Sequence, residues 1–286
     1  HDPRAAGSPM SVLLHLSDTH FGTERAQVIE ALLALAARER PDLVVLSGDI
    51  TQRARPAQFR AARAFVERLG APLLAIPGNH DIALFDLWAR TVQPYARYAR
   101  AFGADLEPVH ASRDLLVVGV NTTRAWRHKH GEVSPLQIDR VTALLRTARP
   151  RQLRVVVVHQ PAAVCRPEDR RHLLRGHHAA LRAWAAAGAD LVLGGHIHLP
   201  YTLAPPGLAR RLWVVQAGTA VSARTRPGFP NSVNIVRWHG GPGGRGADPP
   251  GEDAGRGDCV IERWDYAADA HAFVRAVLTR LTPERA

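Results

Sequence analysis

Short runs of apolar residues recur along the first two thirds of the chain, and most of them end at a small group of polar residues. The runs occupy residues 12–16, 43–46, 73–76, 115–120, 155–158 and 191–193. They are rich in valine and leucine and lack polar alternation, which is typical of strands buried on both faces. In a sheet covered by helices, the polar groups that follow such strands meet at the carboxyl edge.

Between these runs the apolar positions recur with helical spacing. This spacing predicts helices over residues 26–40, 57–69, 135–147 and 173–187, of which the third begins at Ser134-Pro135 and the fourth ends at Gly188. Strands that alternate with helices predict βαβ units with right-handed crossovers. The predicted fold class is therefore α/β.

The last third of the chain has a different pattern, in which strands predominate over helices. Apolar runs at residues 212–216, 232–238 and 259–264 predict strands, and residues 270–281 predict a final helix. Residues 239–258 are crowded with glycine, proline and charge, and we interpret them as a long mobile loop between two antiparallel strands. Too few residues follow for a second core, so we expect one domain over residues 10–286. Residues 1–9, directly before Met10, resemble the remnant of an expression tag.

Composition narrows the class of partner. The 286 residues carry 37 Lys and Arg against 26 Asp and Glu, a net charge of +11, which suits a phosphorylated substrate but also arises from GC-rich coding sequences. No apolar run approaches the roughly 20 residues of a membrane span, so we expect no membrane partner. The two cysteines, Cys165 and Cys259, lack CxxC spacing and favour a reducing compartment, the cytoplasm. The sequence leaves open whether the chain forms a homo-oligomer.

The polar groups at the strand ends contain the ligand types of a two-metal hydrolytic site. Such a site needs ions about 3.5–4 Å apart, a bridging carboxylate, and neutral imidazoles or amides. Asp49 follows a glycine and is the expected bridge. Taken singly, each candidate has a structural explanation, such as a turn or a buried core histidine. The candidates, in chain order, are Asp18, His20, Asp49, Asn79, His159, His196 and His198.

The motifs Asp-x-His, Gly-Asp, Gly-Asn-His-Asp, a single His and Gly-His-x-His, in this order, resemble the calcineurin-like metallophosphoesterase superfamily. The resemblance spans residues 13–264 and implies an αββα sandwich of two mixed β-sheets flanked by helices. It implies two divalent or mixed-valence ions of Mn, Fe, Zn or Co, and attack on phosphorus by a hydroxide that bridges them. By motif, the first ion would be held by Asp18, His20, Asp49 and His198, and the second by Asp49, Asn79, His159 and His196.

The resemblance also assigns roles around the ions. His80 is expected to protonate the leaving alkoxide or to stabilise its charge without binding metal, while Asp81 orients its imidazole. Residues 16–21 and 130–133 make the chain most similar to the bacterial class III cyclic-nucleotide phosphodiesterases. His130, on a basic loop, and Asn121, at a strand end, are candidates for substrate contacts.

These observations predict an enzyme that hydrolyses small phosphodiesters. A phosphomonoesterase or a nuclease on the same site is the alternative, and a non-catalytic binding scaffold is a third. A nuclease, with nucleic acid as partner, is less favoured because no capping domain or helical partner-binding tail is visible. A scaffold is less favoured because the chain retains every ligand position and His80.

Overall fold

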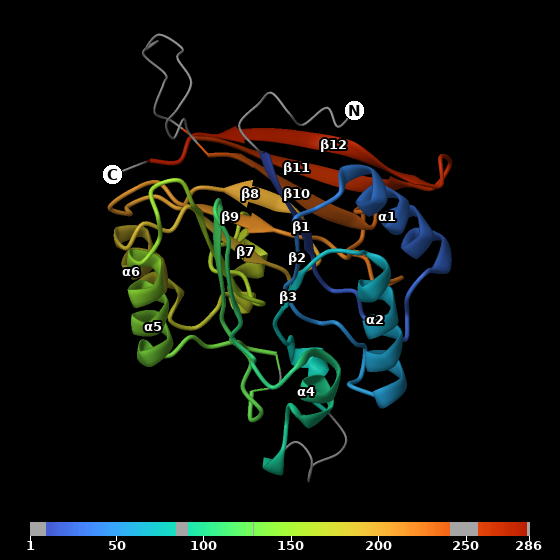
Figure 1. The fold of residues 1–286 in the computed structure, drawn as a ribbon. Helices are drawn as coiled ribbons and strands as arrows, with labels where there is room; N and C mark the ends of the chain where they lie inside the picture. The colour runs from blue at the N-terminus through green and yellow to red at the C-terminus, as the bar shows by residue number, and fades with distance from the viewer. Residues whose placement is uncertain (1–9, 84–90, 128, 241–256, 285–286) are drawn as a thin grey trace.

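The protein is described here by a computed structural model that covers residues 10–83, 91–127, 129–240 and 257–284. Within these residues, two mixed sheets lie face to face and helices cover their outer faces (Figure 1). The sheets have the strand orders β12-β11-β10-β1-β2-β3 and β4-β5-β6-β7-β9-β8. This confirms the predicted αββα sandwich.

The first sheet combines parallel and antiparallel pairs, with β1 parallel to β2 and antiparallel to β10. Its strands are β1 (Met10–Leu16), β2 (Leu43–Leu46), β3 (Leu73–Ala75), β10 (Ser232–His239), β11 (Asp258–Ala267) and β12 (Ala272–Leu281). The second sheet is mostly parallel. Its strands are β4 (Val109–Ala111), β5 (Leu115–Gly119), β6 (Leu153–Val157), β7 (Leu191–Gly194), β8 (Tyr201–Leu203) and β9 (Trp213–Gln216).

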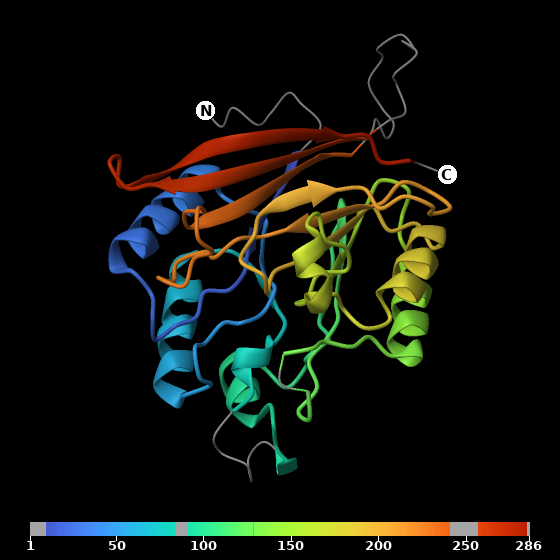
Figure 2. The ribbon, with the colours of Figure 1, turned by 180° about the vertical axis from the view of Figure 1, so that it is seen from behind.

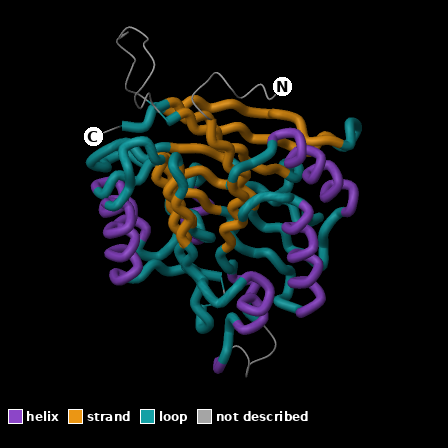
Figure 3. Tube along the Cα trace, viewed as in Figure 1, coloured by secondary structure: helices purple, strands orange, loops and turns teal. Residues whose placement is uncertain are grey.

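Helices lie on the two outer faces, with α1 and α2 on one side and α5 and α6 on the other (Figures 2 and 3). The α-helices are α1 (Ala26–Glu39), α2 (Pro56–Arg68), α4 (Ala96–Phe102), α5 (Pro135–Arg146) and α6 (His177–Ala186). Two short 3-10 helices are η1 (Asn79–Asp81) and η2 (Pro167–His172).

Strand β2 shows why the strands appear in the sequence as continuous apolar runs. All four of its residues are buried. Leu43 and Val45 join the core between the two sheets, whereas Val44 and Leu46 join the core beneath α1 and α2. A strand with both faces buried has no position for a polar side chain. The polar residues are therefore placed at its end, where the chain leaves the sheet.

The predicted helix over residues 270–281 is wrong. Residues 272–281 form β12, which pairs antiparallel with β11 from Ala267↔Ala272 to Cys259↔Leu281. The segment is rich in alanine, leucine and arginine, which favour helix, but pairing with a long neighbouring strand overrides this local preference.

Smaller differences concern helix and loop boundaries. The helix predicted from residue 173 begins at His177, because Gly176 adopts a φ of 85° that ends the preceding turn. The strands around the predicted loop 239–258 pair antiparallel as expected, but residues 241–256 lie outside the described part, as do residues 1–9. None of the helices in the described ranges has the length and apolar character to cross a membrane.

Candidate metal centre

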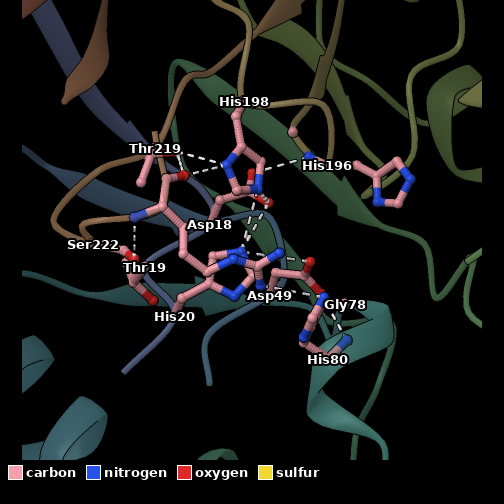
Figure 4. A network of polar contacts seen from close by, with 12 residues as sticks. Asp18, Thr19, His20, Asp49, Gly78, His80, His196, His198, Thr219 and Ser222 are labelled. Carbon is pink, nitrogen blue, oxygen red and sulfur yellow. Dashed lines mark hydrogen bonds and ion pairs between the residues drawn. The ribbon is translucent and has the colours of Figure 1, made fainter. Parts of the chain in front are cut away.

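The seven predicted ligands converge at the carboxyl ends of five strands drawn from both sheets. Asp18 and His20 follow β1, Asp49 follows β2, and Asn79 begins η1 after β3. His159 follows β6, and His196 and His198 follow β7. Figure 4 shows His198, which follows β7, directed toward Asp18 and His20, which follow β1. The structure thus brings together residues that lie up to 180 positions apart in the sequence.

One group of ligand atoms centres on Asp18. Its Oδ1 lies 3.3 Å from His198 Nε2 and 3.7 Å from His20 Nε2, and the two imidazole nitrogens are 3.2 Å apart. These three residues form a cluster whose ligand atoms all lie within 4.8 Å of one another. Two imidazoles and a carboxylate at such distances can hold a transition-metal ion.

A second group centres on Asp49. His159 Nε2 lies 3.3 Å from Asp49 Oδ1 and 3.2 Å from Asn79 Oδ1, and His196 completes a cluster with Asp49 and His159. Asp49 Oδ2 also lies 3.8 Å from His20 Nε2, in the first group. The two groups therefore meet at Asp49, the residue predicted as the bridge.

Backbone carbonyls orient two of the imidazoles. His159 Nδ1 donates to Ser47 O (2.8 Å), and His198 Nδ1 donates to the carbonyl of Arg224. A carbonyl only accepts hydrogen bonds, so Nδ1 carries a proton in both rings. Their Nε2 atoms face the cluster and are the nitrogens available to a metal.

The protonation states suit cation binding. Burial lowers the pKa of His20 and of His196 to about 3, so both imidazoles are neutral. Burial opposes charge on Asp49, but the nearby histidines, led by His159, hold its pKa below the usual range. Burial also lowers the pKa of His159, but the Asp49 and Asp18 carboxylates outweigh it and raise that pKa to about 9. A metal ion competes with this extra proton for the same nitrogen.

Buried polar atoms without partners mark where a cation fits. Neither ring nitrogen of His196 has a hydrogen-bond partner among the described residues, nor does Asp18 Oδ1. Leaving such atoms unpaired costs about 1–3 kcal/mol each, and a bound metal ion would satisfy them. This donor set, of carboxylate, imidazole and amide, fits the dinuclear centre that the motifs imply.

His80 lies at the edge of the cluster. Its Nδ1 donates to the Gln52 carbonyl (2.9 Å), which leaves Nε2 to accept from Arg224 Nη1 at 3.5 Å. The His80 ring packs edge-on against His20, with centroids 4.8 Å apart. Its ligand atom also lies within 4.8 Å of those of His20 and Asp49, which places His80 beside the candidate metal positions.

The predicted role of Asp81 is wrong, because its carboxylate does not contact His80. Instead it accepts hydrogen bonds from the backbone N–H groups of Gly78, Ile50 and Thr51, at 2.8, 3.1 and 2.8 Å, and from the Thr51 hydroxyl at 2.9 Å. Asp81 is fully buried and ties the loop after β2 to the loop after β3. The imidazole of His80 is oriented by a backbone carbonyl, a partner that no sequence motif identifies.

The backbone at the candidate ligands is strained. Five of the eight non-glycine residues with positive φ in the described ranges are candidate ligands, with φ between 41° and 73°. Each such residue costs roughly 1–2 kcal/mol relative to glycine, and this strain concentrates at functional sites. The five are Asp18, His20, Asp49, His196 and His198.

Two pockets border the cluster. One, of about 320 Å³, is lined by Gln52, Arg53, Asn79, His80, Ile82, Lys129 and Arg224. The other, of about 280 Å³, is lined by Glu168, Asp169, Arg171, His172, His196, Ile197, His198 and Arg226. Apart from the predicted ligands and His80, these residues carry no motif, because distant segments supply them.

Neither predicted substrate contact lines these pockets. The Asn121 side-chain oxygen accepts from the backbone N–H and the hydroxyl of Thr123, at 3.1 and 2.6 Å, and so fixes its own loop. His130 is exposed. The adjacent Lys129, which carries no motif, lines the first pocket in its place.

Comparison with known proteins defines the class. The sequence profile of the calcineurin-like phosphoesterases matches residues 11–200, and the chain belongs to this family. The resemblance drawn from the motifs is thereby confirmed. The cAMP/cGMP dual specificity phosphodiesterase of Mycobacterium tuberculosis is 28% identical over 217 residues, which cover 69% of this chain and 65% of that protein.

Other relatives are named for related phosphodiesterase activities. The 3′,5′-cyclic adenosine monophosphate phosphodiesterase CpdA of Escherichia coli is 25% identical and covers 69% of this chain and 70% of its own length. The glycerophosphodiester phosphodiesterase GpdQ of Enterobacter lignolyticus is 43% identical over 83 residues, 24% of this chain and 29% of that protein. The alignments thus span from under a third to about two thirds of these relatives' lengths.

Solved structures share the fold at low sequence identity. A dimetal phosphatase from Danio rerio superposes with a TM-score of 0.67 at 14% identity, covering 96% of this chain and 99% of that one. The purple acid phosphatase PPD1 of yellow lupin gives a TM-score of 0.63 at 11% identity, covering 96% of this chain and 54% of that one. These similarities concern the fold alone.

Proposed function

We propose that this chain is a metal-dependent phosphodiesterase that hydrolyses small phosphodiesters at a dinuclear centre. The observation that carries the proposal is the pair of ligand clusters that meet at Asp49. Membership of the calcineurin-like phosphoesterases supports it, as do relatives named as phosphodiesterases. In this proposal Asp18, His20, Asp49 and His198 hold one ion, and Asp49, Asn79, His159 and His196 hold the other.

The ligand chemistry limits the metals. Imidazole, amide and carboxylate donors suit Mn, Fe, Zn or Co. When bound, two such ions lower the pKa of coordinated water toward neutrality and neutralise charge on the phosphoryl oxygens.

Within the chain, we assign the proton of the leaving group to His80. Because the Gln52 carbonyl holds the proton on Nδ1, Nε2 is the atom that exchanges a proton with the leaving oxygen. Asp81 acts one step further out, as a positioning residue. It ties the Asp49 loop to the Asn79-His80 loop through its hydrogen bonds to both.

The presence of two pockets favours a diester over a monoester. One pocket borders Asn79 and His80, and the other borders His196 and His198. A diester has a substituent on each side of phosphorus, and each pocket can receive one. A monoester leaves one pocket without a substituent.

The proposal is tested by steady-state kinetics on purified protein with added Mn²⁺, Fe²⁺, Zn²⁺ or Co²⁺. We expect hydrolysis of bis(p-nitrophenyl) phosphate, slower hydrolysis of 2′,3′- or 3′,5′-cyclic nucleotides, and loss of both activities in a chelator. A kcat/KM for p-nitrophenyl phosphate well above those of the diesters, with every metal, would identify a phosphomonoesterase. No hydrolysis of any ester with two bound metals would indicate a binding scaffold.

A further inference from the structure

The pocket beside His80 differs in charge from the pocket beside His196. Its lining includes the cations Arg53, Lys129 and Arg224, and no acidic residue among those described. The second pocket contains Glu168 and Asp169, and its Arg226 forms an ion pair with Asp169 at 3.0 Å. Among the described lining residues, the excess of cationic over acidic side chains therefore lies on the His80 side.

Arg224 is held firmly in that pocket. Its Nη1 donates to Gln52 Oε1 at 2.9 Å, and its carbonyl accepts from the Thr219 hydroxyl at 2.9 Å and from His198 Nδ1. Among the described residues, its guanidinium contacts the Gln52 amide and the His80 imidazole but no carboxylate. Lys129 is exposed and has no carboxylate partner in the described ranges. Both cations are thus available to an anionic ligand.

A simple phosphodiester has no second anionic group for these cations. Two divalent ions, if held with the carboxylates of Asp18 and Asp49 and one hydroxide, would carry one net positive charge, which the single negative charge of a diester neutralises. Arg224 and Lys129 both line the pocket that contains His80, the residue to which the proposed function assigns the leaving group. Arginine and lysine are typical partners of phosphate oxygens.

We infer that the leaving alcohol of the substrate carries a phosphate of its own, which Arg224 and Lys129 bind. This inference rests on the proposed phosphodiesterase function and specifies its substrate class, a diester with a phosphorylated leaving group. A 5′-phosphorylated dinucleotide is such a molecule. Water adds to the bridging phosphorus, the P–O3′ bond breaks, and the 3′ oxygen takes up a proton, so pApA and water yield two AMP.

The test compares pApA with ApA, which lacks only the terminal phosphate. With added Mn²⁺ we expect kcat/KM for pApA to exceed that for ApA by about tenfold or more, with the excess shrinking as salt is raised. Arg224→Ala and Lys129→Ala should each reduce this ratio several-fold. Arg60→Ala, which removes an exposed charge from a groove between α2 and α4, should leave the ratio unchanged.

Each outcome separates the inference from the function on which it rests. Clear hydrolysis of ApA with a pApA/ApA ratio near one overturns the inference and leaves the phosphodiesterase intact. Equal losses on both substrates in Arg224→Ala show that the guanidinium acts on the reacting phosphate instead. No hydrolysis of any diester overturns the proposed function. Thermal unfolding of each variant shows whether a loss reflects the fold, and Lys129→Ala, at an exposed position, tests the inference independently.

Discussion

Gly78→Ala tests the close approach of the two loops that carry Asp49 and Asn79. Gly78 has a φ of −100°, which alanine adopts without strain. A Cβ at this position would lie 2.0 Å from the Asp49 backbone nitrogen and 2.3 Å from Asp49 Oδ1. The substitution therefore introduces a steric clash with Asp49, a predicted ligand, without adding backbone strain at residue 78.

The size of the effect follows from that distance. Atoms that are not bonded approach no closer than roughly 3–3.5 Å, so the loops must separate by about 1 Å. Misplacement of catalytic groups by this amount costs about 100-fold in rate. We expect Gly78→Ala to lose about two orders of magnitude in turnover of bis(p-nitrophenyl) phosphate and to hold less metal.

Kinetics, elemental analysis and circular dichroism together check this expectation. Gly207→Ala is the matched control, since a Cβ there would meet nothing within 4 Å. Its positive φ of 74° makes it cost roughly 1–2 kcal/mol of stability, with no loss of activity. A folded Gly78→Ala protein with two metals and wild-type turnover would show that the loops do not meet as described.

Three further predictions concern single side chains. Asp49→Ala should abolish activity and remove at least one metal ion, whereas Asn79→Ala should weaken metal binding mainly at one site. Elemental analysis measures the metal content, and two tightly held metal ions in Asp49→Ala would exclude a bridging role for Asp49. His80→Ala should keep its metals yet lose roughly 10²–10⁴-fold in turnover, and the loss should shrink with a p-nitrophenolate leaving group; equal losses on activated and unactivated esters would argue for substrate positioning. Burial opposes charge on Glu262, but hydrogen bonds from Arg237 and Trp264 lower the pKa of its carboxyl group. The ionised Glu262 therefore stabilises the folded state fully above the unfolded pKa of about 4.3. This stabilisation is lost as the pH falls through the lower folded pKa. Urea unfolding of wild type and Glu262→Gln across this range should show a difference that narrows with acidification, and a constant difference would contradict the assignment.

The strands that end at the site could be predicted from the sequence because each of them consists of consecutive apolar residues, which indicates burial on both faces. The run Leu43–Leu46 is apolar throughout, and the structure buries it on both faces. The motif residues after such strands are fixed by the topology, since parallel strands end at the same edge. The fold and the convergence of the candidate ligands could therefore be inferred together.

Interactions between distant segments could not be predicted in this way. Residues 272–281 form a strand only because β11 lies beside them, and their composition alone favours a helix. Gln52 and Arg224 meet at His80 across 172 positions of sequence. Asp81 stands next to His80 in the chain, yet its carboxylate points to the backbone of the neighbouring loop. Sequence proximity indicated a partner that the folded backbone does not provide.

The left-handed backbone at five candidate ligands bears on how this site is kept or lost over evolution. At these positions glycine would relieve roughly 1–2 kcal/mol of backbone strain in the folded state. Its greater conformational freedom in the unfolded chain would destabilise the folded state by roughly 0.5–1 kcal/mol, which the relief of strain offsets. Backbone strain thus does not oppose a change from candidate ligand to glycine, whereas buried hydrogen bonds do, such as those that Asp18 and Asp49 accept from the backbone N–H groups of His196 (2.9 Å) and His80 (2.8 Å). At the candidate ligands Asp18, His20, Asp49, His196 and His198, the backbone conformation alone would favour glycine, so it is the contacts of the side chains that oppose their loss.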